Sequence, residues 1–446
     1  MRAPLVLLPC VILVIATACN TPGLARQATV TDAPPALSTA PAASREIPNS
    51  PVPTPTYGPT PTYALLPDGL PRIERRPDPS VWNRGALQAL PAVDLQSTDP
   101  WELDLRSMDL SLLDLRDSGE ALTIASFDTE TRWPGAGLLP AGFDPPAILE
   151  LGKDPGLGVR RLHAQGITGR NVGIAIIDQT LLVDHEEYAD RLQVYEEADD
   201  VQGGWLQPQI HGPAVASIAV GRTVGVAPEA DLYYIATAMC NTGSHESIDF
   251  ACLAVSVHRV LEINAELPAN RRIRVLSISV GGAPGDKGYE EIQAATQAAK
   301  EAGLLVICSS VEAVHGFRFH GLGRMQTADP NEFGSYGPGV WWAEEFYAGN
   351  APTDALLVPM GSRTTASPAG TERYSFYSPG GWSWSIPYIA GAYALAAQVS
   401  PDITPDVFWS TALRTGTTIE IDHEGQTYSL GPILNPEALI AALRAE

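Results

Sequence analysis

Short apolar runs separated by longer stretches of helical periodicity constrain the fold of this chain most strongly. The runs lie at residues 172–177, 231–236, 273–280 and 304–308. Uninterrupted runs of this kind are typical of strands buried on both faces. The stretches at 247–267 and 289–302 carry apolar residues at helical spacing, and Asn435-Pro436 is a typical start of a last helix. The pattern predicts an α/β fold: a doubly wound, mostly parallel sheet with helices on both faces.

The chain divides by composition into four parts. Residues 1–19 have a positive start and an apolar stretch that ends in Ala-Cys, which predicts an export signal. Cleavage before Cys19, with lipid attached to this cysteine, is one interpretation, and plain secretion is the other. Residues 20–91 are rich in Pro and Thr and are expected to form a disordered linker. An acidic segment at 92–150 precedes the predicted α/β domain at 151–446.

The charge balance excludes several classes of partner. The 446 residues contain 51 Asp and Glu against 28 Lys and Arg, a formal net charge of −23. Such a chain repels nucleic acids and anionic lipid headgroups, so we expect no nucleic-acid binding. After the N-terminus no apolar run is long enough to span a bilayer, so a membrane contact would be made only through the N-terminal lipid anchor. We expect a monomer.

Asp-Leu pairs recur every five residues in the acidic segment. They begin at Asp104, Asp109 and Asp114. The pairs are interpreted either as one coil of a small repeat solenoid or as irregular strands and turns that cover the next domain. The position of residues 92–150 before the predicted domain also suggests a propeptide-like, inhibitory role as a hypothesis.

The cysteines leave two interpretations open. Export permits a disulfide between Cys240 and Cys252, and reduced, buried thiols are the alternative. No paired Cys-x-x-Cys or Cys/His spacing occurs, which argues against structural zinc.

Four motifs lie where the predicted strands end or helices begin. They are Ile176-Ile177-Asp178, His211-Gly212-Pro213-Ala214, Ser279-Val280-Gly281-Gly282 and Gly381-Trp382-Ser383-Trp384-Ser385-Ile386-Pro387. Together, and in this order, they resemble the subtilisin-like serine peptidases over roughly residues 155–446. The resemblance implies a subtilisin-like fold, with Ser383 as nucleophile, His211 as general base and Asp178 as the group that orients the histidine. It also implies that Ser279, Val280, Gly281 and Gly282 bind the substrate backbone.

The surroundings of Ser383 agree with these roles. The order Asp, His, Ser differs from the order Ser, Asp, His of the α/β-hydrolases. Alanine-rich sequence after Ser383 predicts a helix whose N-terminus presents the Ser383 N–H to an oxyanion. Pro387 is expected in the first turn of this helix.

The chain departs from the family at the second oxyanion donor. The family places an Asn after a buried strand, and aligning 304–312 on that strand puts Glu312 at the position, with Ser310 as the second choice. An ionised Glu312 would repel an oxyanion, whereas a protonated one would donate a hydrogen bond and favour acidic pH. Loss of one such donor typically costs about 10²–10³ in rate. His185, His315 and His320 are interpreted as solvated loop residues.

The main interpretation is a bacterial serine endopeptidase, secreted or lipid-tethered at the cell surface, that hydrolyses proteins or peptides. The alternative is a catalytically impaired domain of the same fold that binds peptides, and an esterase is a third interpretation. No cofactor is expected to be required. Calcium binding is compatible with the resemblance, but no residue is assigned to it.

Overall fold

The computed structural model describes residues 69–95, 97, 101–198, 201, 206–238, 248–309 and 316–445. The signal segment with Cys19, the oxyanion candidates Ser310 and Glu312, and Cys240 and His315 lie outside these ranges.

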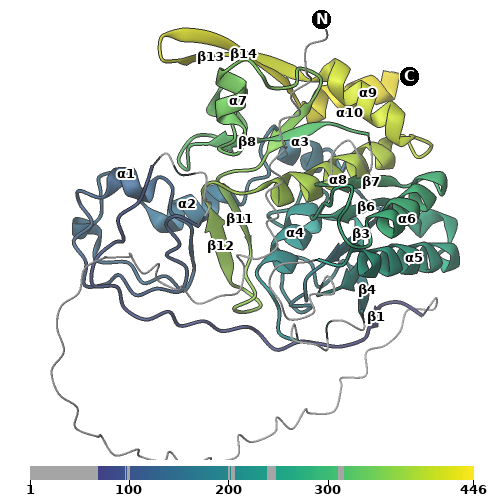
Figure 1. Cartoon of the computed structure of the whole chain (residues 1–446), viewed down its shortest axis with the longest axis horizontal. Coiled ribbons are helices and arrows are strands. Elements are labelled where there is room, and N and C mark those ends of the chain that lie inside the picture. The colour runs from purple at the N-terminus through teal and green to yellow at the C-terminus, as the bar shows by residue number, and fades with distance from the viewer. Residues whose placement is uncertain are drawn as a thin grey trace, which may run out of the picture.

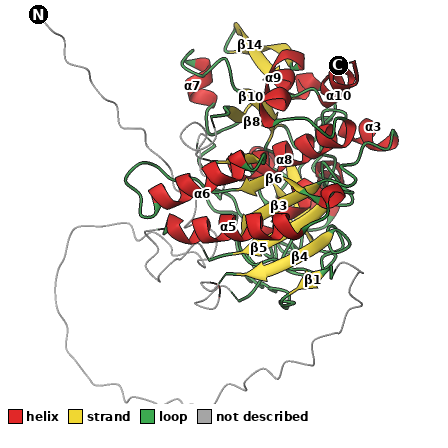
Figure 2. Ribbon diagram, turned by 90° about the vertical axis from the view of Figure 1, so that its right-hand side faces the viewer, coloured by secondary structure: helices red, strands yellow, loops and turns green. Residues whose placement is uncertain are grey.

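A six-stranded, entirely parallel sheet forms the centre of the molecule (Figure 2). Its strands in spatial order are β1 (Arg72–Ile73), β4 (Leu192–Glu197), β5 (Asp231–Ala236), β3 (Gly173–Asp178), β6 (Ile273–Ile278) and β7 (Leu305–Cys308). The four apolar runs of the sequence correspond to β3, β5, β6 and β7. The chain is therefore an α/β protein, as the sequence predicts.

Helices cover both faces of this sheet because alternate residues of each strand point to opposite sides. In β3, Ile174 and Ile176 belong to one buried apolar cluster, while Ala175 and Ile177 belong to another. The first cluster includes residues of α4 (His211–Val220) and α8 (Trp382–Val399), and the second those of α5 (Phe250–Glu266) and α6 (Tyr289–Glu301).

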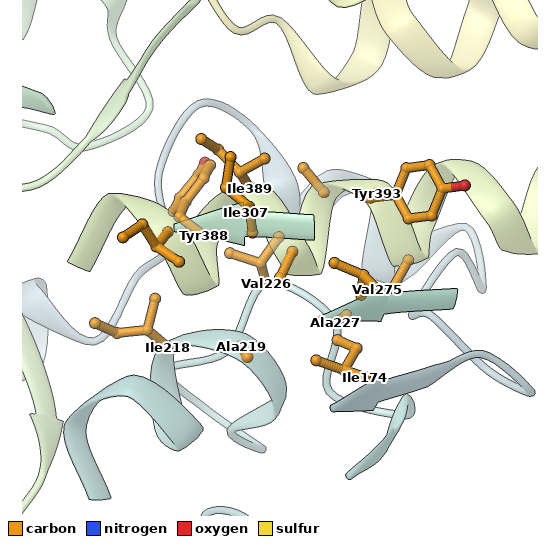
Figure 3. Packing of buried hydrophobic residues seen from close by; sticks show 14 of the residues in the cluster. Ile174, Ile218, Ala219, Val226, Ala227, Val275, Ile307, Tyr388, Ile389 and Tyr393 are labelled. Carbon is orange, nitrogen blue, oxygen red and sulfur yellow. The ribbon is translucent and has the colours of Figure 1, made fainter. Parts of the chain in front are cut away.

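Small residues bring α4 and α8 together under the strand ends that carry the predicted site. Figure 3 shows side chains of both helices meeting those of the strands: Ile174, Ile218, Ala219, Val226, Ala227, Val275, Ile307, Tyr388, Ile389 and Tyr393. Gly391 of α8 allows this approach, because a Cβ there would lie 3.2 Å from Ala219 O of α4 and 2.6 Å from the Cβ of Val226, which follows α4.

A second, five-stranded sheet follows along the chain. It comprises, in spatial order, β13 (Thr417–His423), β14 (Gln426–Ile433), β10 (Leu356–Pro359), β8 (Phe319–Arg324) and β9 (Tyr336–Pro338). The helices near it are α3 (Val159–Ala164), α7 (Ala343–Tyr347), α9 (Pro405–Thr415) and α10 (Pro436–Ala445). Asn435 caps α10 as expected, since its side-chain oxygen accepts a hydrogen bond from Ala438 N.

The acidic segment packs against the α/β domain through a shared sheet (Figure 1). Its elements are α1 (Gly119–Leu122), β2 (Phe127–Asp128) and α2 (Pro145–Gly152). β2 pairs with β12 (Tyr374–Tyr377), which pairs in turn with β11 (Arg363–Ala366). The segment is thus joined to the domain by backbone hydrogen bonds.

The Asp-Leu repeats form a small parallel stack. Leu105 N donates to Ser126 O and Leu110 N to Arg132 O, while Leu87 N donates to Asp109 O. The bridges between these passes are parallel, and the repeat leucines are buried. The structure therefore agrees with the repeat-solenoid interpretation of this segment.

The predicted linker extends too far. Residues 72–73 form edge strand β1, Arg75 pairs with Glu197 at 2.6 Å, and Ser80 Oγ donates to Pro208 O. The boundary expected at residue 91 is therefore wrong, since the chain already packs on the sheet from residue 70. The Pro-rich composition gave no indication of β1, because an edge strand of two residues needs few backbone N–H donors and tolerates neighbouring prolines.

Cys252 is disulfide-bonded, and Cys308 is a buried thiol. The partner predicted for Cys252, Cys240, lies outside the described residues. Within the described ranges, no helix is long and apolar enough to cross a membrane.

Replacement of Gly391 by Ala tests the helix packing. We expect Gly391→Ala to lower the free energy of unfolding by about 1–3 kcal/mol, because the added methyl group overpacks the contact with Val226. The measurement is urea denaturation. Gly137→Ala is the control, because a Cβ there meets no atom within 4 Å. Equal effects of the two changes would contradict this account.

Candidate active site

Asp178 is the last residue of central strand β3 and is fully buried. One carboxylate oxygen, Oδ1, accepts hydrogen bonds from Gln179 N at 2.8 Å and from the His211 ring at 2.7 Å. Strands on both sides hold this end of β3, and Thr237 N donates to the Asp178 carbonyl oxygen. The carboxylate therefore has a fixed position at the carboxyl edge of the sheet.

His211 is the first residue of α4, and its Nδ1 faces Asp178. The following glycine allows this approach. A Cβ at Gly212 would lie 2.5 Å from Gln179 O and 2.6 Å from the Tyr234 hydroxyl oxygen. If His211 Nδ1 carries a proton and donates it to Asp178, the other ring nitrogen, Nε2, is left to accept a proton.

Ser383 is the second residue of α8, which begins directly after extended Gly381. The expectation that Pro387 lies in the first turn is wrong, because Pro387 is the sixth residue of the helix. Pro387 has no N–H to donate to the Ser383 carbonyl, the usual acceptor four residues back. The Ser279 hydroxyl donates to that carbonyl oxygen instead, at 3.2 Å.

The Ser383 hydroxyl points to the same neighbour. Ser383 Oγ donates to Ser279 O at 3.3 Å, and within the described residues it makes no hydrogen bond to His211. The structure therefore joins Asp178 to His211 and Ser279 to Ser383. In structures without substrate, hydrogen bonds of a catalytic group are often long or unformed.

Trp384 brings these two pairs into one site. Its ring meets the His211 ring edge to face, with centroids 5.5 Å apart. It also meets the ring of Tyr377 of β12, at 5.1 Å. Because Trp384 follows Ser383 in α8, its contact with His211 places the start of α8 beside the start of α4.

Ser279 and the predicted substrate segment Val280–Gly282 follow strand β6 directly. A small apolar pocket opens beside this segment. Its lining residues are Phe250, Leu253, Ile278, Val280, Gly281, Gly282, Tyr289, Ile292, Thr296 and Cys308. Of the predicted site residues, Ser310, Glu312 and the lipid-attachment residue Cys19 lie outside the described ranges.

Two histidines do not lie in solvent as the sequence analysis expects. His185 is buried, with Nε2 2.8 Å from Arg373 O and Nδ1 accepting from Glu187 N. His320, on β8, stacks on Trp342 with centroids 4.6 Å apart. Burial, followed by the charge of Arg318, lowers the pKa of His320 to about 4. Both expectations fail because tertiary packing covers these loop-like sequences.

No group of three or more His, Cys, Asp or Glu side chains in the described part of the chain is arranged to hold a metal ion. Calcium binding thus stays without assigned residues.

Comparison with known proteins agrees with this geometry. The model of the subtilase family matches residues 169–313, which include Asp178, His211 and Ser279–Gly282. This matched part, about a third of the chain, is similar to the subtilases. An 87-residue stretch is 39% identical to the subtilisin-like protease PopC of Myxococcus xanthus (strain DK1622), covering 17% of this chain and 18% of that protease. The prenylagaramide maturation protease PagA aligns with 64% of this chain and 98% of its own, at 15% identity and a TM-score of 0.45.

The sequence analysis did not predict the aromatic side chains that surround the candidate site. Trp384 stands within the serine motif, yet its neighbours Tyr377 and His211 are set by the tertiary fold. The sequence contained one indication of Arg106, a further residue that contacts these rings. The sequence Asp-Leu-Arg occurs at both 104–106 and 114–116, and the arginine is buried only in the first copy.

Ser279→Ala tests the bond that replaces the missing helix donor. We expect it to lower the free energy of unfolding by about 1–3 kcal/mol, because the Ser383 carbonyl loses the Ser279 hydroxyl and Pro387 cannot replace it. Chemical denaturation measures the effect. Ser410→Ala is the control, since that exposed hydroxyl donates to Val407 O within α9. A control loss as large as that of Ser279→Ala would refute the argument.

His320→Phe tests the buried imidazole. As the pH falls below the ordinary value of about 6.5, the unfolded chain takes up a proton that folded His320 accepts only near a pKa of about 4. The unfolding free energy should therefore fall by at most about 3 kcal/mol between these pH values through this group. His320→Phe keeps a ring against Trp342 and should reduce that fall. Thermal unfolding from pH 4 to 7 measures it, and an unchanged pH dependence would contradict the assignment.

Proposed function

We propose that this chain is a serine endopeptidase in which Asp178, His211 and Ser383 act as a catalytic triad. The observation that carries the proposal is the 2.7 Å contact between a fully buried carboxylate and His211, beside a serine at a helix N-terminus. A buried carboxylate is costly unless it is paired, so it holds the imidazole in one orientation. The match of residues 169–313 to the subtilase family supports the same assignment.

His211 acts as a base and then as an acid in each half of the reaction. Ser383 Oγ attacks the scissile carbonyl carbon while its proton passes to His211 Nε2, and the imidazolium is stabilised by Asp178. The tetrahedral intermediate expels the amine, which takes the proton from His211, and leaves an acyl-enzyme on Ser383. Water then attacks the ester while its proton passes to His211, and His211 returns this proton to Ser383 Oγ as the C–Oγ bond breaks and the acid product leaves.

The Ser383 N–H supplies one oxyanion donor. It lies at the N-terminus of α8, and none of the described residues accepts a hydrogen bond from it. The second donor is Glu312 or Ser310. A protonated Glu312 would give an acidic pH optimum, whereas Ser310 would donate at any pH.

An extended peptide binds as an added strand along Val280–Gly282. Side chains of such a strand alternate, and the small apolar pocket beside this segment has room for a small aliphatic group. Its wall contains Phe250, Leu253 and Ile292, which offer no charge to a polar side chain.

The N-terminal signal places the protein outside the cytoplasm, secreted or anchored to the cell surface through lipid on Cys19. The protein acts as a monomer on protein or peptide substrates, binds no nucleic acid and requires no cofactor. Calcium binding stays an untested expectation.

One observation favours the alternative of a peptide-binding domain without turnover. Ser383 Oγ donates to Ser279 O instead of to His211, so the nucleophile is not activated in this arrangement. The two functions differ in whether the Ser383 side chain rotates toward His211 when a substrate binds.

A fluorophosphonate probe distinguishes them, because only an activated serine reacts well. We expect the full-length protein to be labelled at Ser383 and Ser383→Ala to lose this labelling. Asp178→Asn should slow labelling by about 10³–10⁴-fold, because the amide favours the wrong imidazole tautomer. The rate is measured by mass spectrometry from pH 4 to 9, and a maximum at acidic pH would favour Glu312 as the donor.

Ser385→Ala is the matched control, since Ser385 is a buried serine of the same helix and should not affect the labelling site. Absence of labelling at every pH, from protein with intact secondary structure, would support the binding domain.

A further inference from the structure

Arg106 of the acidic segment is buried between aromatic rings and fixed on every side. Its guanidinium pairs with Asp104 at 2.8 Å, and its side chain is only 8% exposed. Nη1 donates to the Tyr377 hydroxyl at 3.0 Å. The guanidinium carbon lies 4.7 Å from the Trp101 ring centre and 5.3 Å from that of Tyr377. A planar cation held over two rings is a favourable, rigid arrangement.

The contacts continue from Tyr377 to the proposed active site. Trp101 meets Tyr377 edge to face at 5.8 Å, Tyr377 meets Trp384 at 5.1 Å, and Trp384 meets His211 at 5.5 Å. Tyr377 and Trp384 are both nearly fully buried. A continuous run of packed side chains thus leads from the acidic segment to His211.

His211 needs such a second contact. Its hydrogen bond to Asp178 fixes the position of one ring nitrogen but does not by itself set the tilt of the ring plane. The edge of Trp384 limits that rotation from the side. The plane of the imidazole, and hence the direction of Nε2, depends on where Trp384 lies.

The acidic segment is fastened to the same strand that carries Tyr377. Phe127 and Asp128 of β2 pair with Phe376 and Ser375 of β12. Asp128 also accepts hydrogen bonds from the Ser107 N–H and hydroxyl, next to Arg106. The position of Arg106 relative to Tyr377 is thus set by paired backbone.

We propose that the acidic segment positions the catalytic histidine: Trp101 and Arg106 hold Tyr377, which holds Trp384 against His211. Trp101 and Arg106 are positioning residues and touch no reacting atom. The inference rests on the proposed peptidase function, and it assigns residues 101–128 a supporting role in catalysis in place of the inhibitory one considered from the sequence.

The chain contains its own control for this proposal. The repeat places a second Asp-Leu-Arg ten residues later, where Arg116 pairs with Asp114 at 2.5 Å. The Arg116 side chain is 61% exposed, whereas that of Arg106 is 8% exposed. The two arginines share sequence context and ion pair, and they differ in the ring contacts.

The test is fluorophosphonate inactivation of the full-length protein, analysed for the binding constant Ki and the chemical rate constant kinact separately. We expect Arg106→Ala to lower kinact about 10-fold with Ki unchanged. The change removes the contacts of Arg106 with the Trp101 and Tyr377 rings, so that Tyr377 and Trp384 no longer hold His211 in its orientation. Arg116→Ala should stay within about twofold of the parent. Equal kinact for Arg106→Ala and the parent, or equal losses for both variants, would overturn the proposal.

Two further measurements keep the test decisive. If Arg106→Ala does not fold, Tyr377→Phe keeps the ring but removes the acceptor of Arg106 Nη1, and it should lower kinact while Ki stays constant; an unchanged kinact would refute the proposal. The downfield proton resonance of His211 Nδ1–H should broaden in Arg106→Ala and not in Arg116→Ala. A parent that is not labelled at all would refute the peptidase function itself, whereas labelled variants with parental kinact would refute only the positioning role.

Discussion

The hydrogen bond between Asp178 and His211 is the interaction on which the arrangement of the site depends. A carboxylate without solvent contact at the end of a central strand is costly, and the His211 ring and the Gln179 N–H are the partners that offset this cost. The fold supplies the geometry, because parallel strands end at one edge of the sheet and α4 begins there with His211. The next residue, Gly212, lets the α4 backbone come close to Gln179 and Tyr234. His211 thereby lies beside the start of α8, where its ring contacts Trp384.

Pro387 links Ser383, the proposed nucleophile, to the proposed substrate segment. By removing one helical donor it leaves the Ser383 carbonyl to the Ser279 hydroxyl, while the Ser383 hydroxyl donates to Ser279 O. Two hydrogen bonds thus connect the start of α8 with the residue that precedes Val280. A peptide that binds along Val280–Gly282 would act directly on the partner of the Ser383 hydroxyl, which offers a physical route by which substrate binding redirects Ser383 toward His211.

Much of the fold and the core of the site could be predicted from the sequence, because they rest on local patterns. Uninterrupted apolar runs identified β3, β5, β6 and β7, and short motifs located Asp178, His211 and Ser383. Contacts between distant residues carry no such pattern. Arg106 meets Tyr377 across 271 positions, His185 is covered by Arg373, and β1 is a two-residue edge strand inside a Pro-rich stretch. Tertiary packing decides each of these.

Hydrolysis of an unstructured protein substrate by the purified chain tests the central claim most directly. New N-termini in the products, identified by mass spectrometry, would report cleavage. The account predicts cleavage by the parent, preferably where an apolar side chain can enter the pocket beside Val280, and none by Ser383→Ala. A folded parent that binds such a substrate but leaves every peptide bond intact would contradict it, and so would cleavage that survives in Ser383→Ala.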